Sequence, residues 1–98
     1  MSVAIIANPS AGRGRAQRVI EKIAGVIRER RLDCELITTT GPKHAIELAS
    51  KASQNHEIIA ALGGDGTINE VITGMWDTKS KLAIIPGGTG NDYARGLG

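Results

Sequence analysis

The sequence predicts an α/β protein, with a mainly parallel sheet between layers of helices in a three-layer α/β/α arrangement. Four short apolar runs alternate with segments whose apolar residues recur at helical spacing. Each apolar run is followed by a turn rich in glycine or hydroxyl-bearing residues. Continuous apolar strands are typical of parallel sheets, because helices cover both faces of such a sheet.

The first two units establish this alternation. Val3–Ala7 is an apolar run that stops at Asn8-Pro9, which predicts a buried strand. The next segment is predicted to be a helix because its apolar residues share one face: Ala16, Val19, Ile20, Ile23, Ala24 and Ile27. A second strand is predicted over Cys34–Thr38. Gly41-Pro42 is then expected to open a second helix, since proline suits the first helical position.

The last two units are shorter. The third strand is predicted over Ile58–Leu62, followed by a helix that reaches about Met75, and the fourth strand over residues 82–85. The order of the strands does not follow from these local patterns. The carboxyl ends of parallel strands nevertheless share one edge, where ligands of such sheets bind. Because all four strands are followed by glycine- or hydroxyl-rich turns, we expect a ligand site at this edge.

The turn at residues 63–67, Gly-Gly-Asp-Gly-Thr, is the most informative of these segments. Glycines at a strand-to-helix turn let a ligand approach the backbone, and unpaired N–H groups there suit a phosphate. Gly64 and Gly66 are therefore expected either to adopt positive φ or to lie against phosphate. Asp65 would repel a phosphate unless it meets a cation, a water or a ribose hydroxyl. The segment indicates metal-assisted nucleotide chemistry, and the alternative is a tight turn in which Asp65 only caps a helix.

Composition excludes several classes of function. The chain has 98 residues, enough for one small domain, and its aromatic residues are one Trp and one Tyr. Stacking platforms for single-stranded nucleic acid are therefore hard to build, and no nucleic-acid partner is expected. Cys34 is the single cysteine, which excludes an internal disulfide and a zinc site made of several thiolates. Val3–Ala7 is too short for a membrane span, so a cytoplasmic protein is expected.

Charge is distributed unevenly along the chain. Residues 1–31 hold seven basic and two acidic residues, whereas the remainder holds five basic and eight acidic ones, for a net charge of +2. The basic first helix could contact an anionic membrane surface or a polyphosphate, although a run of charge is more often a solvated helix face.

Four motifs, taken together, carry a resemblance to a known family. They are Asn-Pro-Ser-Ala-Gly at 8–12, Thr39 ahead of the second helix, the segment 63–69, and the segment 86–95. In this order they resemble the nucleotide-binding half of the diacylglycerol kinase catalytic family, which includes bacterial lipid kinases and sphingosine and ceramide kinases. The resemblance covers nearly the whole chain. Gly-Gly-Asp-Gly-Thr is shared with NAD kinases and, loosely, with phosphofructokinases, whereas Asn-Pro-x-x-Gly and Gly-Thr-Gly-Asn-Asp select the lipid kinases.

The resemblance implies an ATP-dependent lipid kinase, with ATP and Mg²⁺ as cofactors and diacylglycerol or a related lipid as acceptor. Residues 1–98 would be the ATP-binding α/β domain, the N-terminal part of a two-domain kinase in which a β-rich second domain supplies the general base. The lipid would react in the cleft between the domains. The piece alone is then expected to be inactive and prone to form homodimers. The intact protein would be cytoplasmic and would touch the inner membrane face transiently.

The resemblance also assigns residues. The nucleotide-binding set it implies is Asn8, Pro9, Ser10, Ala11, Gly12, Thr39, Gly63, Gly64, Asp65, Gly66, Thr67, Ile68, Asn69 and Thr89. Asp65 would organise water and Mg²⁺, and Asp92 is a second catalytic candidate. His44 would cap or line the site, whereas His56 is interpreted as part of a solvated loop. Two positions depart from the family pattern: Gly87 replaces a usual leucine and Tyr93 a usual phenylalanine.

Two other functions stay open at this stage. An NAD kinase-like enzyme would use Asp65 as a base toward a ribose hydroxyl, although the segment 86–92 argues against it. A non-catalytic module that senses nucleotide or phospholipid is the other alternative. An ordinary P-loop is excluded, because no Gly-x-x-x-x-Gly-Lys-Ser/Thr run is present. The sequence does not identify the acceptor lipid.

Overall fold

The computed structural model describes residues 2–85 of the chain. Strands and helices alternate along this part, as the sequence predicts. The elements are β1 (Val3–Ala7), α1 (Arg15–Arg30), β2 (Cys34–Thr38), α2 (His44–Ala52), β3 (Ile58–Leu62), α3 (Asp65–Gly74) and β4 (Lys81–Ile85). The predicted bounds of the first three strands are confirmed, whereas β4 begins at Lys81, one residue earlier than predicted.

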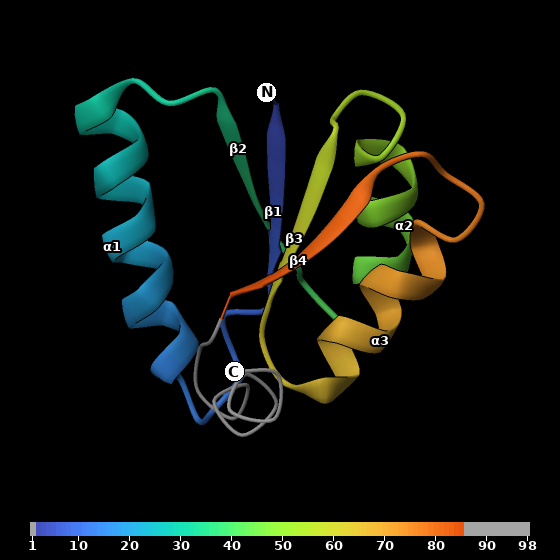
Figure 1. Ribbon diagram of the computed structural model, residues 1–98. Coiled ribbons are helices and arrows are strands. Elements are labelled where there is room, and N and C mark those ends of the chain that lie inside the picture. Colours follow the sequence, from blue (N-terminus) through green and yellow to red (C-terminus); the bar gives the residue numbers. More distant parts are fainter. Residues whose placement is uncertain (1, 86–98) are drawn as a thin grey trace.

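The four described strands form one parallel sheet in the order β2-β1-β3-β4. β1 lies in the middle, where Ala7 is paired with Thr38 of β2 on one side and with Leu62 of β3 on the other. Figure 1 shows α1 on one face of the sheet and both α2 and α3 on the other. The predicted three-layer α/β/α architecture is therefore confirmed.

The core lies on both faces of the sheet because side chains of a strand alternate between its faces. Ala4 and Ile6 of β1 belong to the cluster beneath α2 and α3. Ile5 and Ala7 of the same strand belong to the cluster beneath α1. Each face is thus filled from alternate positions of the same strands, and for this reason the strands are continuous apolar runs.

The start of α2 differs from the prediction. Pro42 does not occupy the first helical position, because the helix begins two residues later, at His44. The intervening Lys43 adopts a left-handed conformation with φ of 64°, and the His44 N–H donates to the Gly41 carbonyl at 3.3 Å. Gly41 and Pro42 therefore belong to a turn that projects beyond the end of β2.

Candidate functional site

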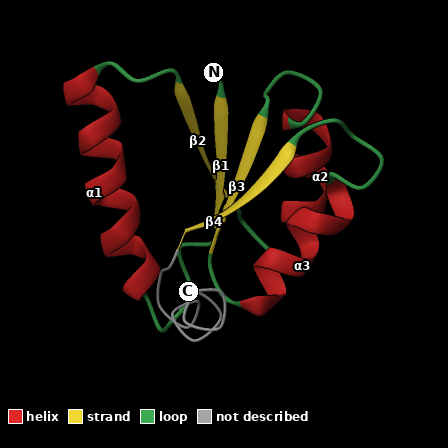
Figure 2. Cartoon of the chain, viewed as in Figure 1, coloured by secondary structure: helices red, strands yellow, loops and turns green. Residues whose placement is uncertain are grey.

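The loops that follow β1, β2 and β3 gather at the carboxyl edge of the sheet, drawn in green at the lower end of Figure 2. Backbone hydrogen bonds tie these strand ends together. The Thr39 N–H donates to the Ala7 carbonyl at 2.8 Å, and the Asn8 N–H donates to the Leu62 carbonyl at 2.9 Å. The chain leaves β1 toward α1 on one face of the sheet and leaves β3 toward α3 on the other face (Figure 1). In open α/β sheets, ligands usually bind between two neighbouring strands whose connections diverge in this way.

The loop after β1 is stabilised by hydrogen bonds to Asn8 and follows an unusual backbone path. The Ser10 N–H donates to Asn8 Oδ1 at 3.0 Å, and the Ala11 N–H donates to the Asn8 carbonyl at 3.2 Å. The chain then turns through three successive residues with positive φ, namely Gly12 (63°), Arg13 (58°) and Gly14 (90°). Glycine adopts such angles without steric cost. The path places the first turn of α1 at the same edge.

The turn between β3 and α3 depends on close packing. Gly63 has a φ of 159°, and a Cβ atom there would lie 2.6 Å from Thr67 Oγ1 and 2.8 Å from Thr67 Cβ. Only glycine therefore lets Thr67 fold back over the turn. Of the two alternatives expected at Gly64 and Gly66, positive φ is excluded, since Gly64 is extended with φ of −88° and Gly66 lies within α3; close approach of phosphate stays a prediction. A Cβ atom at Gly66 would meet nothing within 4 Å.

A pocket of about 350 Å³ opens among these loops. Five of its lining residues belong to the predicted nucleotide-binding set: Asn8, Ser10, Thr39, Gly66 and Thr67. Five more were not predicted: Thr40, Gly41, Pro42, Ala45 and Glu70. The lining is therefore mostly amide, hydroxyl and glycine backbone, with Glu70 as its one titratable side chain among the described residues.

The other predicted residues lie beside the pocket or away from it. Asp65 is exposed in the first turn of α3, and Ile68 is only 1% exposed because it packs in the core beneath α2 and α3. Several occupy the flanking loops and the first turns without lining the pocket: Pro9, Ala11, Gly12, Gly63, Gly64 and Asn69. Thr89 and Asp92 lie outside the described residues.

All three described helices begin at this edge without a side-chain cap. Their N-cap residues are Gly14, Lys43 and Gly64, and none of these makes a capping side-chain hydrogen bond. The N–H groups in the first turn of a helix have no partner within the helix, and the helix dipole makes that end positive. The starts of α2 and α3 therefore present two positive helix ends to the pocket, whereas the first turn of α1 lies at the same edge without lining the pocket.

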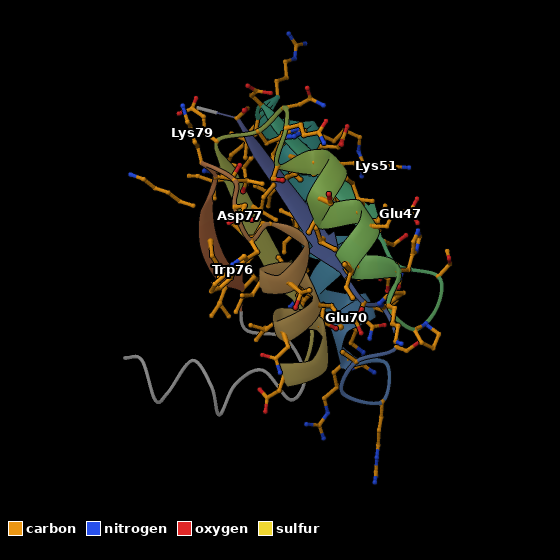
Figure 3. The ribbon with its side chains drawn as sticks, turned by 90° about the vertical axis from the view of Figure 1, so that its right-hand side faces the viewer. Glu47, Lys51, Glu70, Trp76, Asp77 and Lys79 are labelled. Atoms are coloured by element: carbon orange, nitrogen blue, oxygen red, sulfur yellow. The ribbon has the colours of Figure 1, made fainter. Side chains whose placement is uncertain are left out.

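Acidic side chains are few at the pocket. Glu70 is half-buried on the pocket side of α3, and Figure 3 shows it nearer the loop end of the molecule than Glu47 and Lys51 of α2. Glu47 and Lys51 form an exposed ion pair at 3.0 Å, and the hydrogen bond with Lys51 lowers the pKa of Glu47. Within residues 2–85 no group of three or more His, Cys, Asp or Glu side chains could hold a metal ion.

A second, larger pocket of about 460 Å³ lies at the opposite edge, where β1, β3 and β4 begin. Its lining includes His56, Lys79 and Lys81 and contains no glycine. His56 is half-buried in the loop before β3, and its Nδ1 atom lies 2.9 Å from the Ala52 carbonyl oxygen. Because parallel sheets bind ligands at the carboxyl ends of their strands, the smaller pocket is the candidate functional site.

Comparison with known proteins identifies the family of the chain. A family model described as the diacylglycerol kinase catalytic domain matches residues 2–98. The chain is 36% identical over 97 residues to a diacylglycerol kinase of Bacillus subtilis (strain 168), covering 96% of this chain and 32% of that protein. It is 26% identical over 104 residues to sphingosine kinase B of Dictyostelium discoideum, covering 98% of this chain and 14% of that protein.

Solved structures show the same fold. A crystal structure of a diacylglycerol kinase from Bacillus anthracis str. Sterne superposes with a TM-score of 0.78 at 33% identity, covering 98% of this chain and 34% of that one. The chain spans about a third of the length of these bacterial relatives. Since the family model matches nearly the whole chain and the fold is shared, the chain belongs to the diacylglycerol kinase catalytic domain family.

Proposed function

We propose that this chain forms the ATP-binding part of a lipid kinase, which transfers the γ-phosphate of ATP to a hydroxyl group of diacylglycerol or a related lipid. Membership of the diacylglycerol kinase catalytic domain family supports the proposal, as do the kinase names of its relatives. The observation that carries it is the convergence of two uncapped helix starts, those of α2 and α3, on one pocket lined with hydroxyl groups and glycine.

The geometry suits a nucleotide in one orientation. The phosphates would lie at the first turn of α3, where Gly66 and Thr67 line the pocket and the helix N–H groups are open. Glu70, one helical turn further along the same face, would accept a hydrogen bond from a ribose hydroxyl or a base amino group. Asn8 and Thr39 would complete the opposite wall. In this pose Glu70, the one carboxylate among the described residues that line the pocket, stays away from the phosphates.

Mg²⁺ would accompany the phosphates. Asp65 is one exposed carboxylate at the start of α3, and no cluster of acidic side chains exists in the described range. One carboxylate is enough for Mg²⁺, which keeps several waters and takes other ligands from the phosphates of its nucleotide. The residues present therefore fit a water-mediated ion held by Asp65. When bound, the ion neutralises charge on the transferred phosphoryl group.

Catalysis of phosphoryl transfer consists mainly of positioning and charge stabilisation. The helix amides and the Thr67 hydroxyl would orient the phosphates, and Asp65 would order the water around them. We propose that the general base acting on the lipid hydroxyl comes from outside these residues, in a second domain. Asp92 and Thr89, which lie outside the described residues, stay candidates for the cleft beside the γ-phosphate.

The proposed setting follows from the substrate. A kinase acting on a membrane lipid must reach the bilayer surface, and the exposed arginines of α1 offer basic side chains for a transient contact. No helix within residues 2–85 is long and apolar enough to cross a membrane. We propose a cytoplasmic location with contact at the inner membrane face. Homodimerisation of the chain stays a proposal that sedimentation analysis would test.

Calorimetric titration of ATP into the intact protein tests the nucleotide site. Thr67→Val removes a hydroxyl group from the pocket and keeps the shape of the side chain, so we expect affinity to fall about fivefold or more, roughly 1 kcal/mol. Gln54→Ala is the matched control, because Gln54 is exposed and lines only the pocket at the opposite edge. Equal affinities for wild type and Thr67→Val, or a loss in the control as large as in Thr67→Val, would contradict this site.

The acceptor is tested separately with labelled ATP. The intact protein is incubated with vesicles containing diacylglycerol, sphingosine or ceramide, and in parallel with NAD. Labelled lipid phosphate supports the proposal, and labelled NADP would favour the NAD kinase-like alternative. ATP binding without any product would favour a non-catalytic nucleotide-binding module. The chain of residues 1–98 alone should give no lipid product.

A further inference from the structure

His44, the first residue of α2, holds one wall of the pocket through its ring. The Thr40 N–H donates to His44 Nδ1 at 2.9 Å, and Thr40 Oγ1 lies 3.1 Å from the same nitrogen. Thr40 lies within a run of four residues, 39–42, that all line the pocket. The half-buried imidazole therefore holds the backbone of residues 39–42, and these residues form one wall of the pocket.

The hydrogen bond fixes the chemical state of the ring. A backbone N–H can donate only to an imidazole nitrogen that carries no proton, so His44 is neutral with its proton on Nε2. His56, just beyond the other end of α2, has the opposite arrangement. Its Nδ1 lies 2.9 Å from the Ala52 carbonyl oxygen, which only accepts, so Nδ1 of His56 carries a proton.

The wall needs such support because the residue that joins it to α2 has a disfavoured backbone conformation. Lys43 adopts φ of 64°, a left-handed conformation that a lysine side chain disfavours. No proline or side-chain cap holds the start of α2, since Pro42 precedes the left-handed residue and Lys43 makes no capping bond. Three hydrogen bonds tie the wall instead: the Thr39 N–H donates to the Ala7 carbonyl, the Thr40 N–H donates to the His44 ring, and the Gly41 carbonyl accepts from the His44 N–H.

We infer that His44 is a positioning residue for nucleotide binding. Its unprotonated Nδ1 atom accepts the hydrogen bond that holds the wall at residues 39–42 in the conformation that contacts the ligand. The inference rests on the proposed ATP site. His44 itself does not line the pocket, so its effect passes through Thr40 and the neighbouring Thr39. A ring that only filled space would be replaceable by any side chain of similar size, whereas this role needs an acceptor at the Nδ1 position.

Three variants of the intact protein separate these roles. His44→Ala removes the acceptor, and ATP affinity should fall about fivefold or more by calorimetry. His44→Asn restores an acceptor, because Asn Oδ1 is attached at the same side-chain position as His Nδ1, and affinity should return to within about twofold of wild type. His56→Ala is the matched control at the other end of α2 and should leave affinity unchanged. Circular dichroism melting confirms that each variant is folded.

Nuclear magnetic resonance supplies a readout that does not depend on ATP. Long-range ¹H–¹⁵N spectra of the two rings should show Nδ1 unprotonated in His44 and protonated in His56. The Thr40 amide should exchange faster in His44→Ala than in wild type and recover in His44→Asn. A protonated Nδ1 in His44, or unchanged exchange at Thr40, would overturn the inference.

The failures of the two proposals are distinguishable. If wild type binds ATP and His44→Ala binds it equally well, the positioning role is overturned and the ATP site stands. If His44→Asn is as weak as His44→Ala, the acceptor is not what the wall requires and the inference is again overturned. If wild type does not bind ATP, the proposed function falls, and the role of His44 in nucleotide binding falls with it.

Discussion

Gly74 of α3 packs directly against the backbone carbonyl group of Ile46 in α2. A Cβ atom at Gly74 would collide with that carbonyl oxygen and would lie 3.0 Å from Ala49 Cβ. The two helices therefore approach each other more closely than any residue with a side chain would permit at this position. This contact fixes how α2 and α3 sit side by side above the same face of the sheet.

Gly74→Ala should destabilise the fold. The added methyl group must push α3 away from α2, and overpacking of this kind costs about 1–3 kcal/mol. Urea unfolding measures the loss. Gly25→Ala in α1 is the matched control, because a Cβ atom there meets nothing within 4 Å and alanine is the better helix former. We expect the control to gain up to about 1 kcal/mol, and a gain in Gly74→Ala as well would contradict the close contact.

Gly66→Val should reduce ATP affinity at least tenfold, about 1.4 kcal/mol. The new side chain meets no protein atom at its Cβ position, so a loss of affinity would come from the ligand side of the pocket. Far-UV circular dichroism should change little. An affinity equal to that of wild type would show that phosphate does not approach this turn.

Gly63→Ala should act differently, through the fold. Its methyl group would lie 2.6 Å from Thr67 Oγ1, so the first turn of α3 must shift. Both the free energy of unfolding and ATP affinity should fall together, whereas Gly66→Val lowers affinity alone. Paired denaturation and titration experiments on the two variants separate these effects. A Gly63→Ala protein as stable as wild type would contradict the close packing of Thr67.

Asp65→Asn tests the proposed metal role in the intact enzyme. The substitution keeps the size of the side chain and removes the charge that attracts Mg²⁺ through water. Turnover should fall by about a hundredfold or more, a loss comparable to removal of one charge-stabilising group in other enzymes. ATP binding should weaken only modestly. Activity that survives across a range of Mg²⁺ concentrations would leave Asp65 as a turn residue.

Cys34 should react slowly with alkylating reagents. Partial burial, and then the nearby Asp33 carboxylate, raise the pKa of its thiol, which lowers the fraction of reactive thiolate at neutral pH. Folding thus favours the protonated thiol. The contribution of this thiol to the free energy of unfolding is fully present below the ordinary thiol pKa and is lost as pH rises through the raised pKa of the folded state. Asp33→Asn should speed alkylation of the folded protein and leave the unfolded rate nearly unchanged. Equal folded rates would contradict the effect of Asp33.

The sequence predicted the strands well because short apolar runs that end at turn residues are typical of buried parallel strands. It placed the start of α2 wrongly, since the rule that favours proline at the first helical position gave no sign that Lys43 would adopt a left-handed conformation. Glu70 was missed although it follows Thr67 by three residues, a spacing that puts two side chains on one helix face. Which face points at the pocket depends on how α3 packs, and that packing is set by Ile68 and Val71 in the core.

The strand order β2-β1-β3-β4 has a consequence for how the chain folds. β1 comes first in the described sequence, yet its two neighbours, Cys34–Thr38 and Ile58–Leu62, lie far along the chain. During synthesis β1, which is apolar on both faces, therefore stays without its β3 partner until more than half of residues 2–85 have left the ribosome. Closing such distant contacts is slow, and an exposed apolar strand is prone to aggregation meanwhile. Substitutions that weaken β3 should consequently cause a large loss in the yield of soluble protein and only a small loss in the free energy of unfolding of the folded protein.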